Sequence, residues 1–197
     1  TKDNLLKRRW VGNLRCCFCA QDETIQHLFL ECPLAKLLWR TIHIAFNINP
    51  PVDIASLFGT WLAGVEQITA ARIRIGICAL LWAIWNCRND MIFTRQHNLT
   101  FLQVIFRATA WIHTWSLLTP MDSREPLVTG CNQWEMVARV IFNRFGLRLH
   151  NRIESRELIL FIFIVPVGVV HMYFSFFWYS FLLRFVSCKT FMTILDC

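Results

Sequence analysis

Four side chains that can bind a metal, all within one short segment, constrain this chain more than any other feature of its sequence. Their spacing is Cys16-x2-Cys19-x7-His27-x4-Cys32. Two cysteines separated by two residues can hold one ion from a tight turn, and the following histidine and cysteine can complete the tetrahedral nitrogen and sulfur set that Zn²⁺ prefers. Because four protein ligands leave no open position, the spacing predicts a structural ion and not a catalytic one.

Other interpretations of these cysteines remain open on spacing alone. The chain has nine cysteines, so a CxxC pair can arise by chance, and the cluster can be a set of reduced core thiols beside a surface His27. Disulfides are disfavoured because the basic start of the chain is not followed by the apolar region of a signal peptide, which favours an intracellular location. Cys17 is not expected to be a ligand. A Cys17–Cys19 pair would have only one residue between its members, which is a poorer geometry for holding one ion than the Cys16–Cys19 pair.

The distribution of charge divides the chain into two parts of different composition. Residues 1–157 carry +6 of the net charge of +7, whereas residues 158–183 contain no Asp, Glu, Lys or Arg. The second stretch is long enough to cross a hydrocarbon core of about 30 Å.

The cysteine spacing and the distribution of charge together predict a mainly α fold. A small zinc-stapled hairpin is followed by a helical domain and by a C-terminal apolar helix that can span a membrane.

Capping residues and proline predict where the helices of the first part begin. Pro33 suits the first turn of a helix that ends at 47–51, and Asp53 can cap a short helix after that loop. A long buried helix is predicted over 68–93, and either Asn98 or Thr100 can cap the next one.

A polar stretch with two prolines and a glycine predicts a loop over 119–130, before a last helix from about 132 to 156. Together these patterns predict four parts of the chain. They are a zinc-binding module with its following helix (1–46), a helical region (47–157), a candidate transmembrane helix (158–183) and a short tail (184–197).

The residues around the ligands, CCFCAQDETIQHLFLECPLAKLLWR (16–40), resemble the zinc-binding domain that follows the polymerase region in plant non-LTR (LINE-type) retrotransposon reverse transcriptases. That family shows CxxC, then E-T-x-x-H-L-F, then a C-P pair and a tryptophan. The matching positions here are Cys16, Cys19, Glu23, Thr24, His27, Leu28, Phe29, Cys32, Pro33 and Trp39. The stretch ALLWAIWNCRNDMIF (79–93) is also similar to one common in the same open reading frames.

The resemblance implies a non-catalytic zinc-binding domain of a reverse-transcriptase-like protein, with one structural Zn²⁺ held by Cys16, Cys19, His27 and Cys32. The chain has no clustered carboxylates for a pair of Mg²⁺ ions and no Gly-rich phosphate loop, so we expect no polymerase active site, no enzyme activity and no small-molecule substrate.

A basic stretch before the cluster predicts a weak RNA or DNA contact. It contains Lys7, Arg8, Arg9 and Arg15. An ordinary solvated leader explains these residues equally well. A second basic series recurs every four residues near the end of the predicted helical region and is more simply explained as a solvated helix face than as a contact to nucleic acid or anionic lipid. It consists of Arg144, Arg148, Arg152 and Arg156.

Two alternative functions remain. The chain can be a single-pass membrane protein with a cytosolic helical domain, or a non-functional remnant of a retroelement. The expected location is a membrane if residues 158–183 are a genuine part of the protein, and the nucleus or cytoplasm otherwise.

Overall fold

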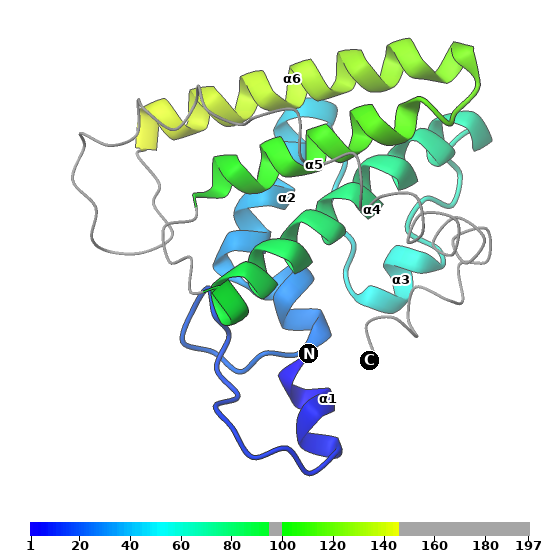
Figure 1. The fold of residues 1–197 in the computed structure, drawn as a ribbon. Coiled ribbons are helices and arrows are strands. Elements are labelled where there is room, and N and C mark those ends of the chain that lie inside the picture. The colour runs from blue at the N-terminus through cyan, green and yellow to red at the C-terminus, as the bar shows by residue number, and fades with distance from the viewer. Residues whose placement is uncertain (95–99, 146–197) are drawn as a thin grey trace. The chain divides into compact units, whose positions relative to one another are not determined.

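The computed structural model of this protein describes residues 1–94 and 100–145, and these residues form helices joined by short loops (Figure 1). In chain order the elements are α1 (Lys2–Lys7), η1 (His27–Glu31), α2 (Pro33–Phe46), α3 (Ile54–Phe58), α4 (Gln67–Asn89), η2 (Asp90–Thr94), α5 (Phe101–Ser116) and α6 (Met121–Phe145). η1 and η2 are π-helical turns. The predicted mainly α fold is confirmed: the described ranges contain no strand, and their one β-type contact is an isolated antiparallel bridge between Arg15 and Asp22.

Three of the predicted helix starts are confirmed in atomic detail. Pro33 occupies the first turn of α2, where its missing N–H costs nothing. Asp53 accepts a hydrogen bond from the Ser56 backbone N–H, and the Ser56 hydroxyl accepts one from the Asp53 N–H, which completes a capping box for α3. Thr100 and Gln103 form the same reciprocal pair at the start of α5.

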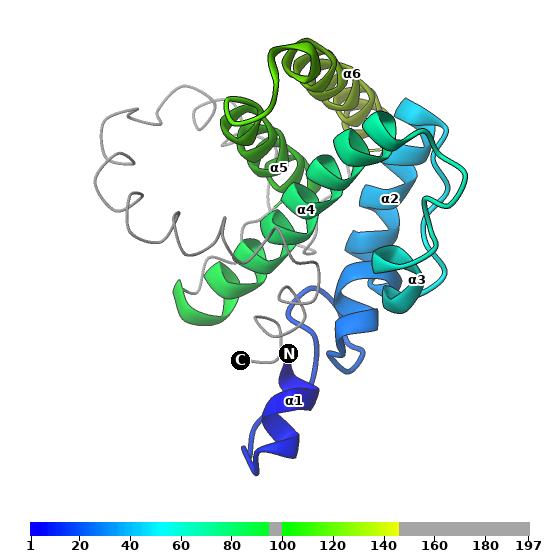
Figure 2. The ribbon, with the colours of Figure 1, turned by 90° about the vertical axis from the view of Figure 1, so that its right-hand side faces the viewer.

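Four longer helices form the core. α5 and α6 run antiparallel side by side, α4 packs against α5, and α2 packs against α6 and α5 (Figures 1 and 2). The largest fully buried aliphatic and aromatic side chains come from η1, α2, α4 and α5, and burial of each such side chain contributes roughly 1.5–3 kcal/mol. They include Leu34, Leu38, Leu80, Leu81, Ile84, Phe101, Val104 and Ile105.

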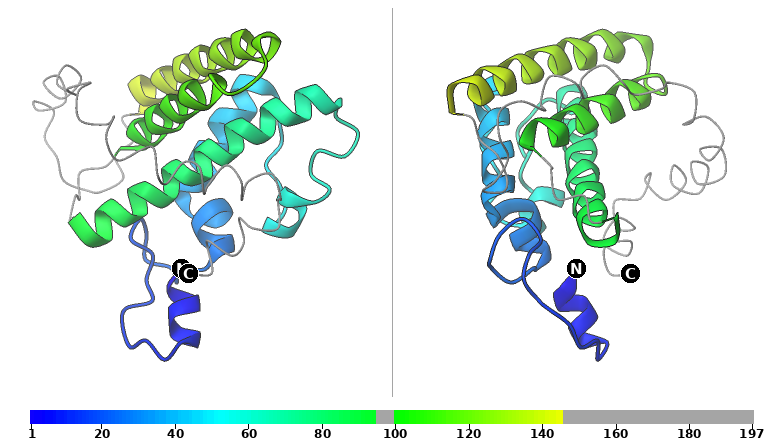
Figure 3. Two further views of the ribbon diagram at one scale, coloured as in Figure 1. Left: turned by 45° about the vertical axis from the view of Figure 1, so that its right-hand side comes forward. Right: turned by 60° about the vertical axis from the view of Figure 1, so that its left-hand side comes forward.

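A polar contact also fixes α6 on α2. The indole Nε1 of Trp134 donates to the Thr41 hydroxyl at 2.7 Å in the interior. By contrast, α1 and the loop after it extend away from the four long helices (Figure 3). The loop between α1 and α2 carries the Cys/His cluster, so the metal-ligating residues lie at one end of the helical unit.

The α4–η2 segment, Gln67–Thr94, is long and apolar enough to cross a membrane by length and composition. Core helices share these properties, and Leu80, Leu81 and Ile84 of α4 are fully buried here. The predicted transmembrane helix at 158–183 and the tail at 184–197 lie outside the described residues. The same holds for Arg148, Arg152 and Arg156 and for the side chain of Arg144.

The prediction of a loop over 119–130 is wrong, because α6 begins at Met121 and includes Pro126. A proline within a helix removes the hydrogen bond to the carbonyl four residues earlier, here that of Asp122. The guanidinium of Arg72 on α4 donates to this carbonyl at 3.1 Å and replaces the lost bond. A partner fifty residues away in the sequence thus satisfies the carbonyl that Pro126 leaves free, in a helix that packs against α5 and α2.

Cys131 on α6 makes stability depend on pH in the alkaline range. Burial, with a smaller contribution from Glu135, raises the pKa of this thiol from 9.0 to about 12. Between these values the unfolded chain loses the proton and the native protein keeps it, so stability falls as pH rises, by about 1.4 kcal/mol per pH unit. Urea unfolding of the wild type and of Cys131→Ala at pH 9, 10 and 11 isolates this contribution as the difference between the two slopes, since burial also raises the pKa of Cys87 to about 11. Cys131→Ala should show a shallower slope, and parallel pH curves for the two proteins would contradict the assignment.

Candidate metal centre

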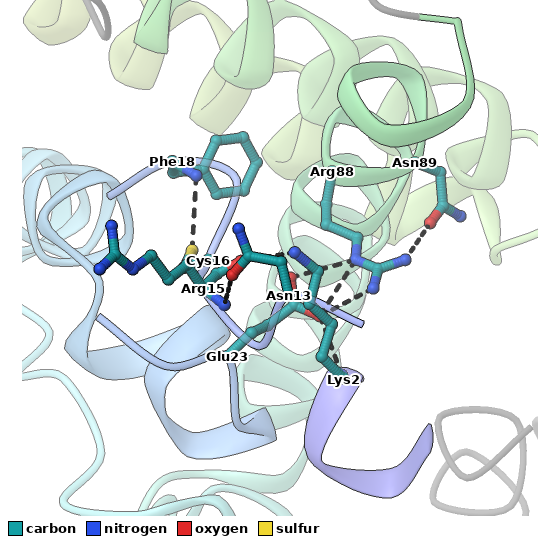
Figure 4. Close-up of polar contacts among 8 residues, drawn as sticks. All are labelled: Lys2, Asn13, Arg15, Cys16, Phe18, Glu23, Arg88 and Asn89. Carbon is teal, nitrogen blue, oxygen red and sulfur yellow. Dashed lines mark hydrogen bonds and ion pairs between the residues drawn. The ribbon is translucent and has the colours of Figure 1, made fainter. Parts of the chain in front are cut away.

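A short backbone hairpin positions the first two cysteines. The Cys16 N–H donates to the Gln21 carbonyl at 2.7 Å, and the Glu23 N–H donates to the Leu14 carbonyl at 2.8 Å. These bonds close the turn that carries Cys16 and Cys19. Within the turn the Phe18 N–H points to the Cys16 sulfur at 3.4 Å (Figure 4). A backbone donor aimed at sulfur favours the thiolate, which is the form that binds metals.

The π-helical turn η1 positions the other two ligands. Thr24 accepts a hydrogen bond from the His27 N–H at 3.0 Å and so caps the turn. The Cys32 N–H then donates to the His27 carbonyl at 2.7 Å, which is the i→i+5 bond of a π-helix. Because this bond places Cys32 one turn after His27, both side chains reach the same site. Pro33 starts α2 directly after Cys32.

The four predicted ligands lie together. The sulfur atoms of Cys16, Cys19 and Cys32 and a ring nitrogen of His27 are all within 4.8 Å of one another, and Cys19 Sγ is 3.1 Å from His27 Nε2. With Zn–S distances of about 2.3 Å and Zn–N distances of about 2.0 Å, tetrahedral geometry places neighbouring ligand atoms roughly 3.5–3.8 Å apart. The arrangement therefore fits one ion with little movement of the side chains.

The three ligand thiols differ in pKa because they differ in burial and in hydrogen bonding. Cys16, His27 and Cys32 are buried and Cys19 is half-buried. Hydrogen bonds from the thiols of Cys17 and then Cys32 lower the pKa of Cys16, while its hydrogen bond with Cys16, followed by burial, raises the pKa of Cys32. Burial also raises the pKa of Cys19. Cys16 is thus the first thiolate, and a metal must displace protons from the other sulfurs.

Cys17 is close to the cluster but is not a member of the four-ligand group. Its sulfur lies within 4.8 Å of Cys16 Sγ and a Glu23 oxygen. The hydrogen bond with Cys16 and then burial raise its pKa, so it remains a neutral thiol that donates to Cys16. All seven cysteines in the described ranges are free thiols.

A buried ion pair ties the metal-binding loop to α4. Arg88 Nη2 lies 2.7 Å from Glu23 Oε1, and Arg88 Nε lies 3.3 Å from both oxygens of the same carboxylate (Figure 4). The two side chains are 6% and 0% exposed. The Lys2 backbone N–H donates to Glu23 Oε1 at 3.1 Å, and the Arg88 guanidinium also stacks on the Trp85 ring at 4.9 Å and donates to Asn89. Each oxygen of the Glu23 carboxylate and each nitrogen of the Arg88 guanidinium therefore has at least one hydrogen-bond partner.

The sequence pattern included Glu23 and Thr24 as positions of the family motif and did not identify Arg88 as the partner of Glu23. The available signal was an arginine directly after the apolar run of a long helix, together with a single glutamate between two ligand pairs. Buried charges of this kind need an opposite partner. The spacing of residues within each segment could not identify the pairing, because 65 positions separate the two partners.

The basic residues before the cluster lie at the end of α1 and in the following loop. Lys7, Arg8, Arg9 and Arg15 are all exposed. Lys7 Nζ donates to Asn4 Oδ1 at 3.1 Å, and Arg9 has a left-handed backbone with φ of 63°. Arg15 precedes the first ligand, and its guanidinium extends away from the Glu23–Arg88 pair (Figure 4).

Residues 1–39 match the family described as zinc-binding in reverse transcriptase. The match includes all four predicted ligands and extends to Trp39 near the middle of α2. It concerns the zinc-binding domain of these proteins and includes no catalytic domain. No curated protein matches the chain, and no solved structure matches it.

Proposed function

We propose that this chain is a non-catalytic part of a retrotransposon reverse transcriptase of the plant LINE type, and that Cys16, Cys19, His27 and Cys32 hold one structural Zn²⁺. The observation that carries the proposal is the convergence of these four ligand atoms within 4.8 Å, inside the segment that matches a zinc-binding family. Three sulfurs and one imidazole nitrogen form a complete tetrahedral set for Zn²⁺, with no position left for a reacting molecule.

The role of the ion is to stabilise a loop that has little core of its own. Between α1 and η1 the backbone makes few hydrogen bonds, and most of its side chains are exposed or half-buried. A bound Zn²⁺ joins the turn at Cys16 and Cys19 to the start of α2 at Cys32. In such sites the free energy of metal binding is also free energy of folding.

The proposal includes contact with RNA or DNA. It is supported by the net charge of +7 and by the exposed basic residues Lys7, Arg8, Arg9 and Arg15 next to the metal centre. Lysine and arginine side chains that replace counterions along a phosphate backbone give binding that weakens as salt increases.

Metal content tests the zinc assignment. The purified full chain should retain about one equivalent of zinc after dialysis, and Cys19→Ser or His27→Ala should reduce this to near zero, because three remaining ligands bind far more weakly than four. Cys17→Ser is the matched control, since it removes a neighbouring thiol outside the four-ligand group. Elemental analysis gives the zinc content. Equal zinc in the wild type, the two ligand variants and the control would refute the site.

A further inference from the structure

A groove runs along α2 beside the metal centre. It has a volume of about 430 Å³ and lies between α2 and the loop that joins α2 to α3. This loop returns alongside α2 (Figure 2). Gln26 holds it in place, because its side-chain amide donates to the Val52 carbonyl at 3.3 Å and accepts from the Ile54 N–H at 3.1 Å. The Trp61 indole donates to the Asn49 carbonyl at 2.9 Å. Hydrogen bonds therefore hold the loop that forms the wall opposite α2.

The floor of the groove is apolar and aromatic. Trp39 lies at its base, only 2% exposed, with its indole Nε1 donating to the Phe29 carbonyl at 2.9 Å. Trp61 meets it edge to face, with ring centroids 5.6 Å apart. Leu30, Pro50, Pro51 and Val52 also belong to the apolar lining. This floor is rigid, since Trp39 is both hydrogen-bonded and packed on a second indole.

The rim of the groove on the α2 side is basic. Lys36, Arg40 and His43 follow one another at i, i+4 and i+7, so they lie on one face of the helix, and all three are exposed. None of these three side chains makes a hydrogen bond or ion pair with another residue in the described part of the chain. The one acidic residue of the lining, Glu31, is exposed and pairs with none of them. The side chains of Lys36 and Arg40 are thus free to bind an anion.

We infer that this groove binds single-stranded nucleic acid, with successive phosphates on Lys36 and Arg40 and a base against the apolar floor. The two cations are about 6 Å apart along the helix axis, which suits neighbouring phosphates of an extended strand. A groove of this volume admits a nucleotide unit but not a duplex. Single strands are typically bound by combining a basic track for the backbone with an apolar or aromatic surface for the bases.

This inference rests on the proposed function, which assigns RNA or DNA contact to the protein but places it on the basic residues near the chain start. The groove supplies what that basic stretch lacks, namely a wall held by hydrogen bonds and an apolar floor beside the cations. We therefore expect Lys36 and Arg40 to contribute more to binding than an equal number of charges from the stretch before the cluster.

The test compares two double variants of the zinc-loaded full chain that each lose two positive charges. Lys36→Gln with Arg40→Gln alters the groove, and Lys7→Gln with Arg15→Gln is the matched control. Fluorescence anisotropy with a labelled RNA of about 12 nucleotides, titrated from about 50 to 200 mM salt, gives Kd and its salt dependence. The groove variant should bind at least about tenfold more weakly, with a salt slope smaller by about 1.4, and the control should change less.

The outcomes separate the two proposals. Absence of RNA binding by the wild type at low salt would overturn both. A loss confined to the control variant, or an equal loss in both variants, would overturn the groove and leave the proposed function standing. Displacement of the RNA by polyglutamate at equal charge concentration would also overturn the groove proposal, because the site would then recognise negative charge alone. Unchanged zinc content in both variants confirms that the metal centre is intact.

Discussion

Replacing Arg88 by methionine is expected to lower the free energy of unfolding by about 3–5 kcal/mol, because it leaves the Glu23 carboxylate buried without its cation. The side chain of Glu23 is fully buried, and the backbone N–H of Lys2 is its remaining donor outside the pair. Urea unfolding of the zinc-loaded protein, followed by circular dichroism, measures the effect. The urea concentration at the unfolding midpoint should decrease. The dependence of the free energy of unfolding on urea concentration should stay the same if the folded structure is retained.

Two further variants show whether the loss comes from the unpaired charge. Arg74→Met makes the same substitution at an exposed position of the same helix and should change stability by no more than about 0.5 kcal/mol. The double variant Glu23→Gln with Arg88→Met removes both charges and should recover part of the loss, since a buried ion pair is often replaceable by neutral groups. If Arg88→Met and Arg74→Met had equal effects, the buried pair would have no special role.

Removing the metal is expected to unfold the loop that carries the ligands while leaving the long helices folded. Structural zinc contributes an apparent binding free energy of about 10–16 kcal/mol in zinc-finger peptides at neutral pH, so a loop with a small core depends on it. Acidification should act in the same direction, because protons compete with zinc for the three thiolates and the imidazole. The helices α4, α5 and α6 have their own buried apolar residues and do not require the ion.

Hydrogen–deuterium exchange resolves this local effect. After treatment with a chelator, peptides that cover residues 14–32 should lose protection, and peptides from α5 should keep it. The Cys16 and Glu23 amides, which donate to backbone carbonyls across the hairpin, are the most informative probes. The Cys17→Ser variant should respond to the chelator as the wild type does, whereas His27→Ala should lack protection in the loop before any chelator is added. Uniform protection with and without the chelator would show that the loop does not depend on metal.

The sequence predicted best those features whose causes are local. The helix starts at Pro33, Asp53 and Thr100 follow from residues within one turn of each start, and all three are present. The ligand set followed from spacing and from a resemblance that a family match over residues 1–39 supports at the level of a zinc-binding domain in reverse transcriptases. The π-helical form of η1 was not predicted, although it is what brings His27 and Cys32 to the same site.

The features that the sequence did not predict depend on contacts between distant residues. The loop expected over 119–130 is part of α6, which packs against α5 and α2, and Arg72 supplies the hydrogen bond that Pro126 removes. The partner of Glu23 could not be found locally, since Arg88 lies on another helix. The groove along α2 was missed for the same reason, because its far wall is a loop that hydrogen bonds from Gln26 and Trp61 hold in place.

The Glu23–Arg88 pair also limits how this protein can be dissected. A fragment cut just after Trp39, where the family match ends, would keep all four ligands. It would lose α4 and with it the Arg88 guanidinium that pairs with Glu23. Such a peptide would leave the Glu23 carboxylate, which is fully buried in the intact protein, without its cation. A piece intended to keep the buried partner of Glu23 therefore has to extend through Arg88, well beyond Cys32, the last of the four ligands.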